Sequence, residues 1–397
     1  MSSERRVTVA TRRDRKSETC VLDETLPALR EGEVRLRVDK VGLSANNVFY
    51  AQMAEAPFLK FASAYPVAGR PELMHVPAWG IGTVTASENP DVSVGQRFRG
   101  FLHLASAVQL GVRKTADGLI ASDPHRRGLV RAYNTLVEVP PAGSSLSGED
   151  ERADLALSSA PSALSGYILA ELLQQKTFYG ADAVAITSAS SKIALSLALC
   201  LAPNRAMGTR VIGYTSASNA SFVRATGLYD DVVLYDQPLP GPLSRQHVLV
   251  DVAGDVSSLR LNRDRIVKAL AVGGTQGSTR TSTFAAFRPS GLLKLAAALS
   301  GSARFEAWAE RTLHPQLEMF FAPTVMADLI RRHGKAEFDR RCDAALGAFA
   351  DHMVTGGHIR VLRCESPAAV QAAYRRVFEG GVLPSEAILV ALAALAP

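Results

Sequence analysis

The sequence predicts an α/β fold in which a partly open β-barrel is followed by a doubly wound parallel sheet flanked by helices. From Arg5 to about Pro140 the chain consists of short β-forming runs separated by turns rich in glycine and proline, which is typical of a small barrel. Beyond residue 150 apolar strands alternate with helical segments, and this alternation indicates a parallel sheet. Because 397 residues exceed the usual size of one domain, we expect two domains, 1–150 and 151–356, with about 357–397 returning to complete the first.

Four segments of the first domain carry the signals of β-strands. Val34 to Val38 alternates apolar and basic residues, which is the two-residue period of a half-buried strand. The other three are Trp79 to Ala86, a turn followed by a strand at Asp91 to Gly100, and Tyr133 to Val139. Gly95 supplies a permissive backbone in one of the connecting turns.

The second domain is predicted as alternating helices and strands that open with a helix over Ala153 to Gln175. Strands are expected at Ala183 to Ile186, Arg210 to Tyr214, Val232 to Tyr235 and His247 to Val252. Helices are expected at Ile193 to Leu201, Ala220 to Thr226 and Arg263 to Ala271, with a helical extension at about 290–355. A late strand at Ile359 to Leu362 and a final strand or short helix at Ala387 to Leu395 end the chain.

The loop after the first of these strands is a candidate phosphate site. It reads Thr-Ser-Ala-Ser-Ser-Lys and leads directly into a helix, an arrangement in which free amides and the helix dipole attract phosphate. It has no glycine, but the hydroxyls of Ser188, Ser190 and Ser191 and the cation of Lys192 suit a dinucleotide pyrophosphate. The alternative is an ordinary helix start capped by Ser190 or Ser191.

The end of the next strand indicates which dinucleotide would bind. NAD usually requires an acidic residue here to accept hydrogen bonds from the ribose hydroxyls. This chain has Thr215, Ser216 and Asn219, with Arg224 one turn further on and no carboxylate before Asp230. A loop of this composition tolerates a 2′-phosphate and favours NADP, unless it is only a turn that caps the following helix.

Small residues follow the two later strands of the sheet. Asp251 and Gly254 close one strand, and Gly273 and Gly274 follow the segment after it. Strand ends at this edge face the ligand crevice of open α/β sheets, so a nicotinamide ribose could lie against the backbone here. Either stretch could also be a simple turn.

Composition argues against several other classes of protein. The net charge of +6 comes from 44 basic and 38 acidic residues, but the arginines are scattered, whereas nucleic-acid binding needs a clustered stripe. The most apolar stretch, Ile193 to Ala202, is too short to span a membrane. Ser2 to Arg15 lacks the apolar centre of a signal peptide. We therefore expect a cytoplasmic protein with neither nucleic acid nor membrane as a partner.

Several segments together resemble the medium-chain dehydrogenases/reductases. Val76 to Val84 resembles the glycine-rich strand of their first domain, and Val92 to Arg97 resembles the turn after it. With the loop at 187–192, the segment at 227–232 and Asn46 to Ala51, the chain resembles a branch catalogued mainly as a domain of unknown function. The resemblance covers nearly the whole chain and implies a GroES-like catalytic barrel joined to a Rossmann cofactor domain.

Zinc is not expected. Zinc-dependent members carry a Gly-His-Glu triplet before the glycine-rich strand, where this chain has Pro77, Ala78 and Trp79. The four cysteines lie far apart without a CxxC pair, which excludes a four-thiolate zinc lobe. The resemblance therefore implies the zinc-free branch, which contains quinone and enoyl reductases, and no metal site.

The resemblance also implies roles for single positions. Ser165 falls where relatives often carry a threonine near the nicotinamide, and Asn219 stands where many carry a lysine that holds the 2′-phosphate. Ser44 and Asn47 replace the asparagine and aspartate of the segment that lines the nicotinamide. Relatives commonly pair through the edge of the cofactor-domain sheet, so a homodimer is expected.

Three residues are candidates for the chemistry. Hydride transfer needs orientation and a group that polarises or protonates the acceptor. Asn46 and Asn47 offer amide donors, and Tyr50 offers a hydroxyl that could donate a proton; all are expected in the loop between a barrel strand and the next helix. Alternatively, the two asparagines form a turn and Tyr50 packs against the barrel.

We therefore predict a zinc-independent NADP(H)-dependent oxidoreductase that reduces an activated C=C bond or a quinone-type small molecule, with Tyr50 or a water as proton donor. Two alternatives remain on the same scaffold. One is a cofactor-binding sensor without turnover, and the other is a non-redox enzyme such as a lyase or an acyl-processing enzyme.

Overall fold

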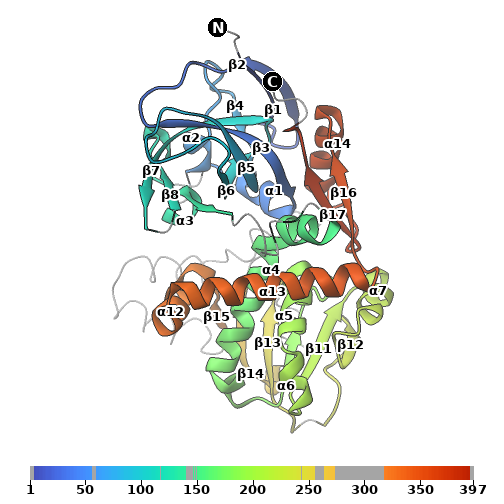
Figure 1. Ribbon diagram of the computed structural model, residues 1–397. Coiled ribbons are helices and arrows are strands. Elements are labelled where there is room, and N and C mark those ends of the chain that lie inside the picture. The colour runs from blue at the N-terminus through green and yellow to red at the C-terminus, as the bar shows by residue number, and fades with distance from the viewer. Residues whose placement is uncertain are drawn as a thin grey trace. The chain divides into compact units, whose positions relative to one another are not determined.

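The computed structural model describes residues 4–55, 60–116, 118–139, 146, 148, 150–242, 244–254, 263–272 and 317–393. The chain divides into two compact units (Figure 1). The first comprises Met1–Ser159 together with Ile359–Pro397, and the second comprises Ala160–His358. No helix among the described residues is both long enough and apolar enough to cross a membrane.

The first unit is built on a ring of six antiparallel strands. Each strand pairs with two neighbours, and the pairing of the sixth strand with the first closes the ring. The ring is narrowest at β9, which pairs with each neighbour through only two residues. In order around the ring, the strands are β3 (Glu33–Leu43), β5 (Pro77–Ser87), β6 (Arg97–His103), β9 (Thr135–Glu138), β8 (Gly118–Ala121) and β7 (Ala107–Thr115).

Alternating apolar residues fill the inside of this barrel. Val34, Leu36 and Val38 of β3 point into one buried cluster, as the two-residue period predicts. Gly80 of β5 is needed for the close approach of the two strands, because a Cβ there would lie 2.6 Å from the carbonyl oxygen of Lys40. The glycine-rich strand of the sequence is therefore a packing requirement of the barrel.

The end of the chain completes the first unit. Strand β17 (Glu386–Val390) pairs antiparallel with β3 and parallel with β16 (Arg360–Cys364), which extends the barrel sheet. Helix α14 (Pro367–Phe378) follows β16. Beside the ring, a three-stranded sheet is formed by β2 (Thr19–Thr25), β1 (Arg5–Arg12) and β4 (Leu73–His75).

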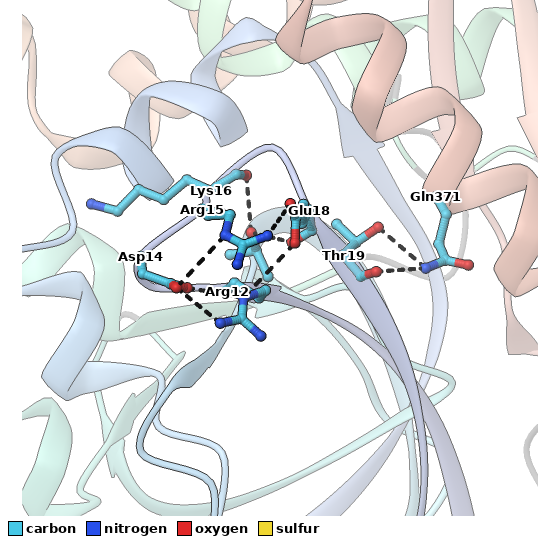
Figure 2. Close-up of polar contacts among 8 residues, drawn as sticks. Arg12, Asp14, Arg15, Lys16, Glu18, Thr19 and Gln371 are labelled. Carbon is cyan, nitrogen blue, oxygen red and sulfur yellow. Dashed lines mark hydrogen bonds and ion pairs between the residues drawn. The ribbon is translucent and has the colours of Figure 1, made fainter.

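Hydrogen bonds attach α14 to the hairpin between β1 and β2. The side-chain amide nitrogen of Gln371 donates to the carbonyl oxygen of Thr19 at 2.9 Å, as Figure 2 shows. The hydroxyl of Tyr374 donates to the carbonyl oxygen of Lys16 at 2.9 Å. Exposed ion pairs such as Arg12 with Asp14 surround this turn (Figure 2); pairs of this kind contribute little to stability.

A buried carboxylate joins three segments of the first unit. Asp154, at the start of α4 (Glu151–Gln175), accepts a hydrogen bond at 2.9 Å from the Lys40 ammonium on β3. Its other oxygen pairs with Arg363 on β16. Asp154 is 0% exposed and Lys40 is 4% exposed. Because water does not solvate these two charges, each is stabilised by the other.

The second unit contains a six-stranded parallel sheet. From edge to edge, its strands are β12 (Asp231–Leu234), β11 (Arg210–Thr215), β10 (Ala183–Ile186), β13 (His247–Asp251), β14 (Ile266–Ala271) and β15 (Leu317–Met319). Numbered along the chain, this is the order 3-2-1-4-5-6 of a doubly wound sheet, which changes direction between β10 and β13. Ligands of such sheets bind outside the carboxyl ends of the strands at this switch point.

Three predicted elements differ from the structure. The segment Arg263 to Ala271, predicted as a helix, forms one 3-10 turn and then β14, whose Ile266, Ala269 and Leu270 are buried. A short apolar run does not distinguish a buried helix from a buried strand, and here the neighbouring strands decide. The strand predicted from Tyr133 begins at Thr135, after the short helix α3 (Arg131–Asn134). The final segment is a strand, one of the two states predicted for it, and differs only in that it ends at Val390.

The predicted helical extension contains α12 (Ala322–His333) and α13 (Lys335–Thr355). The prediction is wrong at Leu317–Met319, which form strand β15 because they pair with β14 at the edge of the parallel sheet. Its first part, 290–316, lies outside the described residues.

Candidate functional site

The candidate phosphate loop lies at the switch point of the parallel sheet. Strand β10 ends at Ile186, and α5 (Lys192–Cys200) begins after a loop of five residues. Ser191 caps this helix, since its hydroxyl oxygen accepts a hydrogen bond from the amide of Ala194 at 3.3 Å. The amide of Ile193 is one of the first-turn groups that an α-helix leaves without a partner of its own. The loop therefore presents donors at a helix N-terminus, as anion binding requires.

Ser188 takes the backbone conformation that glycine would take in such a loop. Its φ is +52°, in the left-handed region that costs a residue with a Cβ about 1–2 kcal/mol. Two tyrosine hydroxyls hold the loop around it. The hydroxyl of Tyr235 accepts from the amide of Ser188 at 2.8 Å, and that of Tyr229 donates to the carbonyl oxygen of Ala189 at 2.8 Å.

The two tyrosines flank β12, which is two strands away from β10 in the sheet. Burial, and then the nearby Tyr235, raise the pKa of Tyr229 well above its usual value. The hydroxyl of Tyr229 is therefore protonated at neutral pH and remains a donor. These contacts explain how a loop without glycine keeps a tight geometry.

Thr187 connects the two strand ends on either side of the switch point. Its hydroxyl donates to Oδ1 of Asp251 at 2.7 Å and accepts from the amides of Val252 and Ala253 at 2.8 and 2.9 Å. Asp251 Oδ1 also accepts from the amide of Gly254 at 3.1 Å. Asp251, a predicted cofactor residue, is thus bonded within the protein, and it shapes the turn that carries Gly254.

The loop after β11 is connected to the phosphate loop by one side-chain contact. The side-chain amide nitrogen of Asn219 donates to the hydroxyl oxygen of Ser190 at 3.2 Å. Thr215 is buried at the end of β11, while the hydroxyls of Ser216 and Ser218 lie 2.9 Å apart. The structure thus brings the predicted residues of the two loops together.

Other predicted cofactor residues lie apart from this contact. Arg224 is exposed on α7 (Ala220–Ala225). Ser165 lies in α4, where its hydroxyl donates to the carbonyl oxygen of Pro161 at 2.8 Å. Gly273 and Gly274 lie outside the described residues.

The two candidate asparagines lie in the first turn of α1 (Ala45–Gln52) and not in the preceding loop. Asn47 is buried and both of its polar atoms are engaged: Oδ1 accepts from the amide of Ser44 at 2.7 Å, and Nδ2 donates to the carbonyl oxygen of Pro77 at 2.8 Å. It therefore caps α1 and attaches it to β5. Asn46 is half-buried and forms no side-chain hydrogen bond with a described residue.

Tyr50 lies in an aromatic cluster of the first unit. Its ring centroid is 5.1 Å from those of Phe61 and Phe101 and 6.0 Å from that of Tyr133. Burial, and then the neighbouring phenol of Tyr133, raise the pKa of Tyr50 well above its usual range. Tyr50 is thus a protonated phenol in an apolar setting. Trp79 and Tyr133, which are only partly buried, pack against the same cluster.

Sequence reasoning missed the residues that support these sites. Thr187, Tyr229 and Tyr235 act through contacts with residues 40 to 66 positions away. Only Thr187 carried a signal, as a hydroxyl at the end of the first parallel strand. Among the described residues, no three histidine, cysteine or acidic side chains are grouped so that they could hold a metal ion.

Comparison with known proteins gives one family and several similar structures. The family model described as "Protein of unknown function (DUF2855)" matches residues 41–383. No curated protein matches the sequence. The chain is similar to the yhdH oxidoreductase from Salmonella enterica in complex with NADP, with 14% identity and a TM-score of 0.51 over 98% of this chain and 99% of that one.

Two further solved structures are similar over most of the chain. The quinone oxidoreductase from Coxiella burnetii has 14% identity and a TM-score of 0.51, over 98% of this chain and 99% of that one. A putative NADPH:quinone reductase from Bacillus thuringiensis has 12% identity and a TM-score of 0.54, over the same shares. These similarities confirm the predicted fold class, a GroES-like barrel domain with a Rossmann domain.

Proposed function

The chain belongs to the DUF2855 family of proteins of unknown function, and on that premise we propose that it is a zinc-independent oxidoreductase that uses NADP(H). The observation that carries the proposal is the pair of loops at the carboxyl ends of β10 and β11. They are rich in hydroxyl groups, free of carboxylates and joined by the hydrogen bond from Asn219 to Ser190. This composition suits a dinucleotide with a 2′-phosphate better than one with two ribose hydroxyls.

The phosphate loop would hold the pyrophosphate. The first-turn amides of α5 and the hydroxyls of Ser188, Ser190 and Ser191 would donate hydrogen bonds, and Lys192 would add a positive charge. Asn219, Ser216 and Thr215 would surround the adenosine ribose, with Arg224 as a cation for the 2′-phosphate. Asp251, Gly254, Gly273 and Gly274, with Ser165, would lie along the nicotinamide end of the cofactor. Solved structures of similar fold contain NADP or NADPH, which supports this assignment.

The chemistry proposed is reduction of an activated C=C bond or a quinone-type acceptor. The cofactor would supply hydride, so that the protein needs only to orient the acceptor and provide a proton. Asn46, whose side-chain amide forms no hydrogen bond with a described residue, would donate to the acceptor oxygen, and Asn47 would hold the turn that presents it. Tyr50 would supply the proton, directly or through a water; its phenol stays protonated at neutral pH, and an enolate is basic enough to accept that proton.

Binding is tested by calorimetric titration of the full chain with NADPH and NADH. We expect NADPH to bind more tightly. Lys192→Ala should weaken NADPH binding by about 1–3 kcal/mol, as expected for a lost charged hydrogen bond. Lys176→Ala is the matched control, because Lys176 is exposed and lies before the amino end of β10, whereas the phosphate loop follows its carboxyl end. Equal affinities of the two variants would contradict the phosphate site.

Ser191 allows binding to be separated from folding. Ser191→Ala removes the phosphate donor together with the helix cap, which itself stabilises by about 1 kcal/mol. Ser191→Asp keeps the cap but brings a carboxylate beside the phosphates, so NADPH affinity should fall while the free energy of unfolding is unchanged. Wild-type affinity in Ser191→Asp would mean that no phosphate lies at this helix.

Turnover is tested by loss of NADPH absorbance with a panel of enones and quinones. Tyr50→Phe should lower kcat more than it lowers NADPH affinity, and unchanged kcat would remove Tyr50 from the mechanism. NADPH binding without oxidation across the panel would favour a cofactor-binding sensor. Absence of binding by both nucleotides would favour a non-redox enzyme, such as a lyase or an acyl-processing enzyme.

A further inference from the structure

A buried cluster of basic side chains lies in the first unit, and the proposed function does not use it. His75 ends β4, His103 ends β6, and Arg126 ends a 3-10 turn (Pro124–Arg126). These side chains are 4%, 6% and 2% exposed, respectively. We call these three residues the buried basic cluster.

Ring contacts hold the cluster together around Tyr65. The imidazoles of His75 and His103 are stacked, with centroids 4.3 Å apart and an angle of 17° between their planes. The Tyr65 ring packs edge-on against His103 at 6.4 Å, and the Arg126 guanidinium lies 4.6 Å from the centre of the Tyr65 ring. Tyr65 and Arg126 both donate to the carbonyl oxygen of Phe101, at 3.1 and 3.3 Å.

Four polar atoms of this cluster are buried without a hydrogen-bond partner among the residues that the structure describes. They are Nδ1 of His75, both ring nitrogens of His103 and Nε of Arg126. Buried polar atoms in native proteins almost always have partners, and each group without one costs about 1–3 kcal/mol. Four such atoms on three residues linked through Tyr65 favour a further component that the protein chain alone does not supply.

The charged groups that lower the pKa values of the two histidines are positive. Burial, followed by the nearby cations Arg6 and Arg126 and by His125, lowers the pKa of His75 to about 3. Burial and then His75 lower that of His103 well below its usual value. Both imidazoles are therefore neutral at neutral pH, and each carries one N–H donor.

Arg126 thus brings a buried positive charge without an ion-pair partner. No carboxylate of a described residue lies within 4.0 Å of its guanidinium. Arg6 is paired with Glu24 at 3.0 Å, and Oδ1 of the nearby Asp123 accepts from the amide of Gly111 at 3.1 Å. A buried charge without a partner is strongly destabilising, so a negative charge at this place would lower the free energy of the fold.

We propose that the buried basic cluster binds one small monovalent anion, either a halide ion or the carboxylate group of a small organic acid. The anion accepts hydrogen bonds from Nε of Arg126 and from the N–H groups of the two imidazoles, and it neutralises the guanidinium. A metal ion does not fit, because the buried Arg126 guanidinium repels it. A water molecule satisfies the hydrogen bonds but leaves the charge uncompensated.

Thermal unfolding of the full chain tests this proposal. At constant ionic strength, sodium bromide or sodium formate is substituted for sodium gluconate, whose anion is too large for the site. Wild-type Tm should rise with bromide or formate and then saturate, because a ligand that binds only the folded state stabilises it by mass action. A rise with bromide alone assigns a halide site, and a rise with formate as well assigns a carboxylate site. A Tm equal in all three salts overturns the proposal.

Variants locate the site. Arg126→Gln should abolish the dependence of Tm on bromide, whereas Arg127→Gln, which changes the exposed neighbour, should retain it. If Arg126→Gln does not fold, His103→Phe serves in its place, since it keeps a stacked ring and removes the ring nitrogens. An unchanged bromide dependence in the folded variant of the cluster overturns the assignment.

Asp123→Asn separates an external anion from an internal counter-ion, because Oδ2 of Asp123 is buried without a partner. The proposal requires Tm to depend on bromide in the wild type, and Asp123→Asn to preserve or strengthen that dependence. If the dependence appears only in Asp123→Asn, then Asp123 neutralises Arg126 itself and the proposal is wrong. In bromide-soaked crystals, an anomalous peak beside Arg126 Nε is expected, and a water alone at that position would overturn the assignment.

Discussion

Replacing Thr187 by valine tests how the two strand ends are held at the switch point. The substitution keeps the branched shape of the side chain and removes only its hydroxyl. That hydroxyl forms three hydrogen bonds, with Oδ1 of Asp251 and with the amides of Val252 and Ala253. Thr187 is 0% exposed, so water cannot take over these bonds.

The magnitude follows from the groups that lose their partner. Two backbone amides lose their acceptor, and each buried unsatisfied group costs about 1–3 kcal/mol. Thr187→Val should therefore lower the free energy of unfolding by roughly 2–6 kcal/mol. Thr187→Ser keeps the hydroxyl and loses one methyl group, which costs about 1 kcal/mol. The valine variant should accordingly be the less stable by at least about 1 kcal/mol.

Urea unfolding followed by circular dichroism gives the stabilities, and calorimetry gives the NADPH affinity of the same three proteins. Because Thr187 also begins the phosphate loop, we expect Thr187→Val to lose at least about tenfold in affinity, which corresponds to about 1.4 kcal/mol. The Thr187→Ser variant should bind NADPH with the affinity of the wild type. If valine and serine variants unfold at the same urea concentration, Thr187 does not connect the two strands as described.

Three further perturbations have expected outcomes. Asp154→Ala should cost about 3–5 kcal/mol in urea unfolding because it removes the carboxylate that pairs with the buried Lys40 ammonium, while Asp14→Ala, at an exposed pair, should cost far less; equal losses would contradict the burial argument. Ser188→Gly should raise stability by about 1 kcal/mol by removing left-handed strain, and a loss of stability would refute that strain. Since burial lowers the pKa of His75 to about 3 and that of His103 well below its usual value, the unfolded chain binds more protons below pH 6.5. Stability should thus fall by about 2 kcal/mol per histidine between pH 6.5 and 5, and His75→Phe should flatten this fall; an unchanged pH profile in that variant would exclude His75 as a source.

The order of elements in the second unit could be predicted from the sequence because each signal is local. Apolar strands such as Ala183–Ile186 and His247–Asp251 lie close to the segments predicted for them. The exceptions are Ile266–Ala271 and Leu317–Met319, which form strands where helix was predicted. Segments this short have no period that separates the two states, so their pairing with neighbouring strands of the sheet determines the outcome.

The supporting contacts could not be predicted, since they join residues far apart in the chain. Nothing near Asn47 in the sequence indicates that its amide bonds to Pro77, thirty residues away. The same holds for Asp154, whose partners Lys40 and Arg363 lie 114 and 209 residues away. The residue types were visible in the sequence, but whether each polar group faces a ligand or the protein depends on the tertiary fold.

The candidate phosphate loop lacks the glycines of the usual dinucleotide-binding motif but keeps the left-handed backbone that a glycine would provide. Glycine normally supplies two properties in such a loop, a left-handed backbone and room for close approach. Here Ser188 adopts the left-handed backbone, and the hydroxyls of Tyr229 and Tyr235 hold the two peptide groups around it. The strain at Ser188 is thereby offset by hydrogen bonds from residues that border another strand. A sequence pattern limited to the loop does not include those distant tyrosines, whereas the strand order 3-2-1-4-5-6 makes this loop the candidate site without any glycine.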